Sequence, residues 1–230
     1  VKDAVVSAED TKFYDHSGID MKGIARAAWN NISGGDTQGA STITQQYARD
    51  AARLTGMNYN RKIREALLAR KIEDNYEKDE ILSFYLNAIY FGRGAYGIEA
   101  AAEAYFNKSV TTPPDKEGAI TAAEAAVLAS VIKQPEPSKG HPGFDPHYDL
   151  AEAKGRWVYT MDNMVELGFL TSQQRAEAVF PEGTLVPYDP DGCQAQCVGN
   201  KPMGHVLTYV KQELEQMGIT DWRQKPYKIT

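Results

Sequence analysis

The first stretch of the sequence able to do chemistry runs from Glu9 to Asp20. It gathers four carboxylates and one histidine around Gly18, an unusual composition for a solvated helix face (Glu9, Asp10, Asp15, Asp20 and His16). Carboxylates and histidine are among the side chains that most often move protons in enzymes. The spacing by itself favours a plainer interpretation, because acidic residues before a helix are stabilised by its dipole and His16 can be a structural histidine.

A second stretch, residues 39–49, places hydroxyl groups at the start of a helix and amide side chains one turn later. Backbone N–H groups at a helix start, together with Ser41 and Thr42, can hold an anionic group. Gln45 and Gln46 follow them on the first turn. A Ser/Thr cap followed by a polar helix face explains the same spacing equally well.

Cations concentrate between residues 49 and 71, where seven basic side chains stand against two acidic ones on a chain of net charge −6. Arg61 and Lys62 lie four and three residues before Glu65, so a helix brings all three to one face. This spacing predicts a local anion site, although a surface ion pair of little energetic value fits it too. Beside two cations Glu65 favours its charged form, which suits orienting cations or a metal ion better than donating a proton.

A fourth stretch, residues 85–102, joins two predicted helices through three glycines and several aromatic residues. Glycines permit a sharp turn and a close approach of the backbone. For most of these residues, core packing and a helix–helix turn are a sufficient explanation.

The elements that must position these stretches are predicted to be helices almost everywhere. Apolar residues recur at three- and four-residue spacing, with capping residues and glycines at the ends of the runs. We expect helices over residues 21–32, 42–54, 60–76, 78–90, 96–106, 121–133, 150–167, 171–180 and 204–217. Loops rich in Pro, Gly and Asp are expected at 109–118, 134–149 and 181–203. Strand patterns are weak and confined to 185–188 and 226–230, so the predicted fold class is mainly α.

The composition is that of a globular protein, with 230 residues, 42% of them hydrophobic and 24% charged. The net negative charge disfavours nucleic acid as a partner. The chain starts at Val1 without a signal segment and has no apolar run of about 18 residues, so we expect a piece of a longer protein whose membrane anchor lies upstream. Cys193 and Cys197 are close enough to pair, which would place the domain outside the cytosol, whereas two free thiols fit the spacing as well.

Together and in this order, the four stretches resemble the motifs of the family 51 glycosyltransferase domain of class A penicillin-binding proteins and monofunctional peptidoglycan glycosyltransferases. The motifs match over residues 9–108, a weaker fifth one follows at 123–129, and the resemblance extends to about residue 180. The helix expected at 204–217 resembles the linker to a transpeptidase domain, which favours a bifunctional parent. We therefore expect a glycosyltransferase domain over residues 1–180 and a linker over 181–230.

The resemblance implies a lysozyme-like glycosyltransferase fold with a large helical lobe and a smaller, membrane-facing lobe. It implies work at the extracytoplasmic face of the bacterial cytoplasmic membrane on lipid II, a disaccharide-peptide carried by undecaprenyl diphosphate. Lipid II would be polymerised into β-1,4-linked glycan. Because the donor bond is α and the product bond is β, a single in-line displacement with inversion explains the reaction.

Carried over by position, Glu9 is the general base that takes the proton of the acceptor 4-hydroxyl, and Glu65 is the second motif glutamate. Arg49, Arg61 and Lys62 fall where the family's cations meet the diphosphate, whose oxygens suit guanidinium forks. A divalent cation, Mg²⁺ or Mn²⁺, held with Glu65 would share that role, and no organic cofactor is expected. Further positions are expected to contact substrate: Asp10, His16, Ser41, Thr42, Gln45, Gln46 and Asn87.

The implied partners are lipid II, the growing glycan chain, the membrane, phosphoglycolipid inhibitors of the moenomycin type and other cell-wall synthesis proteins. The sequence departs from the family pattern at Ala40, where a second glycine is common, at Arg49, where lysine is common, and at Asn107, where glycine is common. The family often has a basic residue eight positions before the second glutamate. That offset falls on Met57, so either Arg53 substitutes for the basic residue or that contact is missing.

Two other functions fit part of the pattern. A lysozyme or lytic transglycosylase would use Glu9 in the same fold to cut glycan, but it releases no diphosphate and leaves the cation cluster unexplained. A catalytically silent scaffold that recruits wall enzymes would be suggested by the loss of either glutamate, and both are present.

Overall fold

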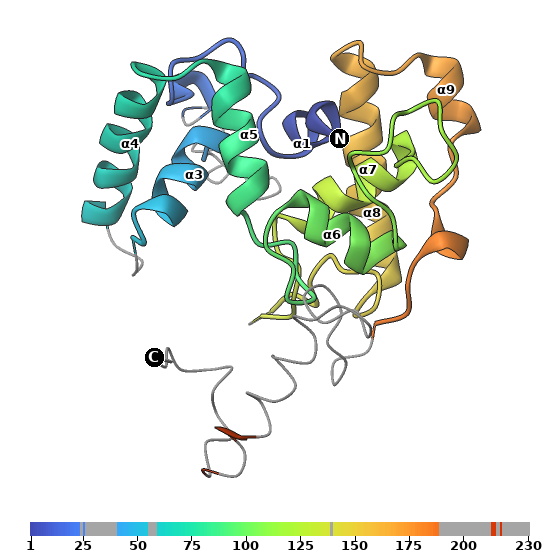
Figure 1. The fold of residues 1–230 in the computed structure, drawn as a ribbon. Helices are drawn as coiled ribbons and strands as arrows, with labels where there is room; N and C mark the ends of the chain where they lie inside the picture. Colours follow the sequence, from blue (N-terminus) through green and yellow to red (C-terminus); the bar gives the residue numbers. More distant parts are fainter. Residues whose placement is uncertain are drawn as a thin grey trace.

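The helices of the chain are arranged in two lobes (Figure 1). The computed structural model describes residues 1–23, 25, 41–54, 59–138, 140–188, 213, 214 and 217. Over these residues the secondary structure consists of helices, loops and two isolated bridges, without a strand. None of the described helices is long and apolar enough to cross a membrane. The mainly α class predicted from the sequence is confirmed.

In the described part of the smaller lobe, α3 packs against two other helices, α4 and α5 (Figure 1). Its helices are α3 (Ile43–Ala51), α4 (Tyr59–Glu73) and α5 (Lys78–Ala88). Tyr47 stacks on Phe84 with 5.9 Å between ring centroids and joins α3 to α5. The Thr44 hydroxyl donates to a Glu73 carboxylate oxygen at 2.6 Å and joins α3 to α4. These contacts hold the second and third sequence stretches side by side.

The larger lobe is built around α7, which contacts α1, α6 and α8. Its elements are α1 (Lys2–Glu9), α6 (Ile98–Phe106), α7 (Ala122–Val131), α8 (Leu150–Glu166), α9 (Ser172–Glu177) and the 3-10 helix η1 (Glu182–Thr184). Every residue from 124 to 131 is buried. An α-helix with no exposed face belongs at the centre of a core, and the other helices cover α7.

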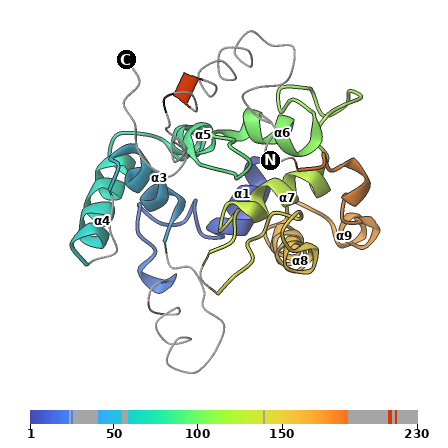
Figure 2. The same ribbon diagram turned by 90° about the horizontal axis from the view of Figure 1, so that it is seen from below.

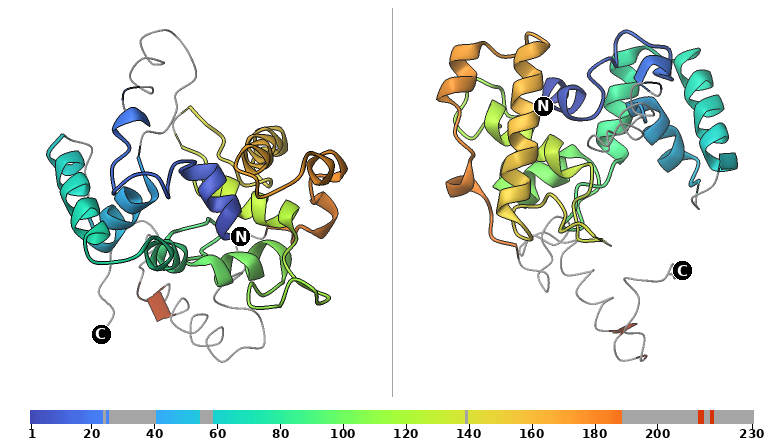
Figure 3. Two further views of the ribbon diagram at one scale, coloured as in Figure 1. Left: turned by 90° about the horizontal axis from the view of Figure 1, so that it is seen from above. Right: turned by 180° about the vertical axis from the view of Figure 1, so that it is seen from behind.

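Sequence patterns did not predict α1. Residues 4–8 are all buried, because α7 and α8 pack against this helix. A helix that is buried on every side has no alternation of apolar and polar residues to detect, and α1, unlike the equally buried α7, also lacks a capping side chain at its start. In the view from below, α1 lies between the helices of the two lobes (Figure 2). Figure 3 shows α8 running beside α1. Glu9, the last residue of α1, is therefore placed where the lobes meet.

Side-chain caps begin several of the predicted helices. At the N-caps of α3, α7 and α9 a threonine accepts the backbone N–H of the residue three positions later, whose side chain bonds back (Thr42, Thr121 and Thr171). Asp149 caps α8 through the amides of Ala151 and Glu152. The seven helices expected between residues 42 and 180 are confirmed, and most end a few residues earlier than expected. In α5, for example, the backbone is already extended at Ile89.

Some sequence expectations fall outside the described residues. These are the pairing of Cys193 with Cys197, the strand at 226–230 and, apart from residues 213, 214 and 217, the helix at 204–217. The helix expected at 21–32 is described only at its start, where residues 21–23 are helical and Asp20 accepts the Gly23 amide at 2.8 Å.

The weak strand expected at 185–188 is absent from the described structure, so this expectation was wrong. Val186 donates its amide to the Tyr105 carbonyl at 2.8 Å. This bond reaches the end of a helix, α6, where no extended partner strand is available to continue a ladder.

A buried ion pair fastens the turn between α5 and α6 to the larger lobe. Arg93 donates to Asp145 through Nε at 2.7 Å and Nη2 at 2.8 Å, and both side chains are 2% exposed. Tyr105 donates to the same carboxylate at 3.1 Å, and Arg93 Nη1 donates to the Val186 carbonyl at 2.8 Å. The turn that connects the two lobes is thus held by a bidentate pair in the core.

Candidate active site

A cleft of about 770 Å³ separates the two lobes at the end of α1. Side chains from α3 form one wall, and side chains from α8 and the loop before it form the other. The lining includes Glu9 from α1, Thr42, Gln46 and Arg49 from α3 and its cap, and Arg156 and Tyr159 from α8. The first two sequence stretches therefore meet in one place.

The Glu9 carboxylate lies in this cleft with its side chain 8% exposed. One oxygen, Oε2, accepts from Gln46 Nε2 at 3.0 Å. The Gln46 amide is oriented in turn by Tyr85, whose hydroxyl donates to Gln46 Oε1 at 2.9 Å. Burial, followed by the negative charge of Glu9, raises the pKa of Tyr85 well above its ordinary value, so the phenol keeps its proton and acts as the donor.

The other oxygen of Glu9 is held by a residue that sequence reasoning missed. Arg156 Nη2 donates to Glu9 Oε1 at 3.1 Å and to the Ala8 carbonyl at 2.6 Å. Arg156 follows the buried Ala153 by three residues and precedes the buried Thr160 by four, so it lies on the apolar face of α8. A cation on the buried face of an amphipathic helix was the available signal.

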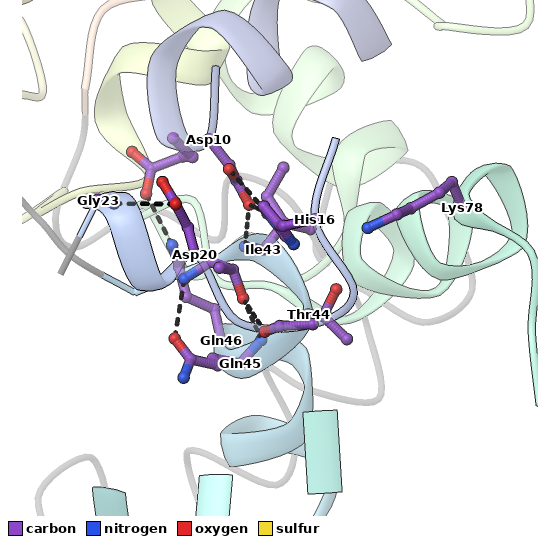
Figure 4. Close-up of polar contacts among 12 residues, drawn as sticks. Asp10, His16, Asp20, Gly23, Ile43, Thr44, Gln45, Gln46 and Lys78 are labelled. Carbon is purple, nitrogen blue, oxygen red and sulfur yellow. Dashed lines mark hydrogen bonds and ion pairs between the residues drawn. The ribbon is translucent and has the colours of Figure 1, made fainter. Parts of the chain in front are cut away.

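Asp10 lines the cleft and binds His16, which is not part of the described cleft lining (Figure 4). Asp10 accepts His16 Nε2 at 2.9 and 3.1 Å, and its Oδ2 also accepts the backbone amide of Ile43 at 3.0 Å. Ile43 is the first residue of α3, where an anionic group is favoured by the exposed amides and the helix dipole. The pair therefore fastens the first stretch to the start of α3.

Two residues that were predicted to contact substrate form the N-terminal cap of α3. Thr42 and Gln45 bond to each other in the capping box, and the Thr42 hydroxyl donates to the Gly18 carbonyl at 2.7 Å. Gly18 has a φ of 83°, and a Cβ there would lie 2.9 Å from the Ala69 backbone, so the loop comes this close only with glycine. Thr42 lines the cleft and Gln45, 4% exposed, does not.

The cation cluster forms beside this cap. The Glu65 carboxylate, 1% exposed, receives Arg61 on Oε1 and Lys62 on Oε2, the latter at 3.0 Å. Lys62 Nζ also donates to the Ser41 hydroxyl at 2.5 Å, and Ser41 lines the cleft. The pKa of Lys62 is lowered by burial and then by the positive charges of Arg61 and Arg49, so the three predicted cations act on one another.

Arg49 is the member of the cluster that lines the cleft itself. Its Nε bonds to Asp50 at 3.1 Å, and its side chain is 36% exposed. A group bound near Ser41 and Arg49 would therefore lie on the α3 side of Glu9. This arrangement can hold an anion next to a carboxylate that accepts a proton.

Glu65 does not fit the role of a metal ligand as the residues stand. Both of its oxygens already accept from cations. Within the described part of the chain, no group of three or more His, Cys, Asp or Glu side chains is placed to hold a metal ion.

Asn87 lies apart from the other predicted residues. It is exposed near the end of α5, and its Nδ2 donates to the Ser83 carbonyl one turn earlier at 2.8 Å. It is not part of the described cleft lining.

The opposite wall of the cleft contains residues that no motif suggested. They come from the end of α7, the following loop and α8, and include Lys133, His141, Phe144, Glu152 and Tyr159. The Arg156 guanidinium lies 4.6 Å from the centre of the Tyr159 ring. Charged and aromatic groups therefore face the α3 wall across Glu9.

The comparisons with known proteins agree with one another. A family model described as Transglycosylase matches residues 1–165. Penicillin-binding protein 1A of Mycobacterium tuberculosis is 42% identical over 221 residues, which are 94% of this chain and 25% of that protein. Penicillin-binding protein 1A of Neisseria flavescens is 45% identical over 183 residues, which are 79% of this chain and 21% of that protein. The chain thus spans about a quarter or less of the length of these curated relatives.

Among solved structures, the crystal structure of penicillin-binding protein 1A from Haemophilus influenzae is similar with a TM-score of 0.41 and 24% identity, covering 76% of this chain and 21% of that one. The family model alone covers well over half of the chain. The chain therefore belongs to the transglycosylase family, the peptidoglycan glycosyltransferase domains of class A penicillin-binding proteins.

Proposed function

We propose that this domain polymerises lipid II into β-1,4-linked glycan by an inverting displacement of undecaprenyl diphosphate. The observation that carries the proposal is the position of Glu9, whose carboxylate is held in a cleft with a hydroxyl and a cation site on its α3 side. A base and an anion site on neighbouring surfaces are what transfer from a sugar diphosphate requires.

Glu9 acts as the general base. Each of its oxygens accepts one hydrogen bond from the protein, which leaves further lone pairs for the acceptor hydroxyl. As the acceptor 4-oxygen bonds to the donor anomeric carbon, its proton passes to Glu9. The bond from that carbon to the diphosphate breaks on the opposite face, so the α bond becomes a β bond without a covalent enzyme intermediate.

The leaving diphosphate is received by cations. Arg49 lines the cleft, and Lys62 reaches its edge through Ser41 while remaining paired with Glu65. Positive groups fixed before the reaction stabilise the charge that develops on the leaving oxygens. A divalent cation accompanying the diphosphate would add to this charge. Glu65 then serves to orient Lys62 and Arg61.

The proposal also gives the extent of the domain and its place in the cell. The glycosyltransferase domain covers residues 1–180, and residues 181–230 are a linker. The domain works at the extracytoplasmic face of the bacterial cytoplasmic membrane, to which an N-terminal helix anchors it. The smaller lobe faces that membrane. The partners of the domain are lipid II, the growing glycan chain, phosphoglycolipid inhibitors of the moenomycin type and other cell-wall synthesis proteins.

The test is polymerisation of lipid II by the purified chain in detergent. We expect long glycan on a gel that lysozyme digests, together with release of undecaprenyl diphosphate. A cleaving enzyme would instead shorten preformed glycan and leave lipid II intact, and that outcome would replace the transferase. Lipid II and glycan that are neither converted nor bound by the chain would indicate a scaffold.

A further inference from the structure

One face of α8 lines the cleft beside the residue that holds the proposed base. The residues of this face are spaced as successive turns of a helix require, and all of them line the cleft (Glu152, Gly155, Arg156 and Tyr159). Arg156 binds Glu9. Glu152 precedes Arg156 by four residues, so it lies one helical turn, about 5 Å, further along the same wall. Neither the sequence motifs nor the proposed base and cations use the rest of this face.

Gly155 is the unexpected residue of the face, because it stands in the interior of α8. Glycine destabilises a helix interior relative to alanine. Packing does not require it, since a Cβ at Gly155 would meet no described neighbour within 4 Å. Its backbone is helical, so no left-handed φ requires glycine either. The remaining use of such a glycine is to let a ligand in the cleft approach the helix backbone closely.

Glu152 offers a carboxylate at the rim of the same face. Its side chain is 51% exposed, whereas that of Glu9 is 8% exposed. His141 Nε2 lies 3.8 Å from the Glu152 carboxylate, which is too long for a hydrogen bond. The imidazole is oriented by the Gly143 amide, which donates to His141 Nδ1 at 2.9 Å. Among the described residues no hydrogen bond reaches the Glu152 carboxylate, so its oxygens can accept donors from a ligand.

We propose that this face of α8 binds the peptide branch of the disaccharide-peptide, with the peptide passing over Gly155 and a side-chain ammonium group at Glu152. The reacting sugar lies at Glu9, in the buried part of the cleft, and a branch from that sugar reaches the exposed rim one turn away. A carboxylate at the rim favours a positive charge, which the peptide can bring and the N-acetylated sugars cannot. This inference rests on the proposed function and deepens it, since it gives the peptide a place and a charge preference.

Calorimetric titration with three soluble probes tests the charge preference. The probes are a disaccharide carrying a pentapeptide with one lysine, the same molecule with the lysine amine acetylated, and the disaccharide without a peptide. We expect the unchanged chain to bind the free amine about fivefold more tightly than the acetylated form, because acetylation removes the positive charge. Glu152→Gln should abolish that difference. Glu166→Gln is the matched control and should keep it, because Glu166 is also exposed on α8 and lies outside the described cleft lining.

Equal affinities for the two disaccharide-peptides in the unchanged chain, equally weak ones included, would overturn the assignment. A difference that survives in Glu152→Gln would overturn it as well. Loss of affinity for the peptide-free disaccharide in Glu152→Gln would assign this carboxylate to the sugar instead. These titrations need no turnover. A chain that keeps the amine preference but does not polymerise lipid II would therefore count against the polymerase and not against this site.

Gly155→Gln tests whether the peptide passes over the helix backbone. Glutamine is a better helix former than glycine, so the melting temperature should rise. The added side chain should nevertheless lower the affinity for both disaccharide-peptides several-fold and leave the affinity for the peptide-free disaccharide unchanged. Val158→Gln is the control, because Val158 is exposed on the same helix and lies outside the described cleft lining. Unaltered peptide affinity in Gly155→Gln would overturn the placement of the peptide on α8.

Discussion

At the scale of single residues, the central feature is a carboxylate whose two oxygens are held from opposite sides. Arg156 of α8 binds one oxygen of Glu9 and Gln46 of α3 binds the other. The Glu9 side chain is 8% exposed and that of Arg156 is 13% exposed. Removing either charge would leave the other buried without its partner, which is costly. Arg156 is therefore a positioning residue that fixes the orientation of the Glu9 carboxylate.

Replacing Arg156 tests this positioning. Arg156→Gln should lower kcat about 100-fold through misplacement of the base, with little change in KM. Arg156→Lys keeps the charge without the planar guanidinium group, so its kcat should lie between those of the unchanged chain and Arg156→Gln. Steady-state polymerisation kinetics measure the effects on kcat and KM separately. A rise in KM with kcat preserved would show that Arg156 binds substrate rather than orienting Glu9.

Lys62 predicts a pH dependence. Burial and the charges of Arg61 and Arg49 lower its pKa from the ordinary 10.5, so it loses its proton at a lower pH than a free lysine. Only the protonated amine attracts a diphosphate, so affinity should fall as the pH rises through the alkaline range below 10.5. Lys62→Arg should retain affinity to higher pH, because the guanidinium stays protonated. Identical pH curves for inorganic diphosphate in both proteins would contradict this.

At the scale of elements, the start of α3 is the point on which the first two sequence stretches converge. Asp10 accepts the Ile43 amide and His16, and Thr42 reaches back to Gly18. The backbone after Glu9 is thereby tied to the helix that contributes Gln46. Asp10 also lines the cleft, so a variant is needed to separate this anchoring from the predicted substrate contact.

Asp10→Asn separates anchoring from substrate contact. We expect a loss of about 1–3 kcal/mol in the free energy of unfolding, because a charge-assisted bond at a buried helix start is weakened. The value of kcat should fall as well, and the affinity for inorganic diphosphate should not change. Asp149→Asn is the control at another N-cap, where asparagine caps about as well. A selective loss of diphosphate affinity in Asp10→Asn would restore the substrate contact expected from sequence.

Periodicity and capping residues predicted most helices, because those helices have one buried face and one exposed face. The same reasoning failed for α1, whose residues 4–8 are all buried and whose N-cap, Val1, has no capping side chain, whereas the equally buried α7 begins with a capping box at Thr121. The motifs singled out Glu9, Ser41, Gln46 and Arg49, and all four line one cleft. Arg156 lies 147 residues from Glu9 in the chain, and only the packing of α8 on α1 brings the two together. Asn87, by contrast, shares a motif but points elsewhere.

At the scale of the whole molecule, a mainly helical fold places the Glu9 carboxylate in the cleft between two lobes. The smaller lobe contributes cations and the larger lobe contributes Arg156 and a mixed aromatic and charged wall. The turn from α5 to α6 connects the lobes, and Arg93 and Asp145 fix it in the core. The geometry of the cleft depends on that connection.

Breaking this buried pair should destabilise the whole chain. Asp145→Asn leaves the Arg93 charge uncompensated and should cost about 3–5 kcal/mol in chemical denaturation. The exposed pair between Lys154 and Glu182, 2.8 Å apart, is the control, and Glu182→Gln should cost about 0–1 kcal/mol. Equal losses for the two variants would mean that the core pair does not hold the lobes together.

The most direct test of the account is the polymerisation rate of Glu9→Gln on lipid II. Glutamine keeps the shape of the side chain and removes its ability to take a proton, so we expect glycan synthesis to fall below detection. The melting curve and the affinity for inorganic diphosphate should stay near those of the unchanged chain, which would show that the cleft is intact. Polymerisation within a few-fold of the unchanged rate would contradict the assignment of Glu9 as the general base.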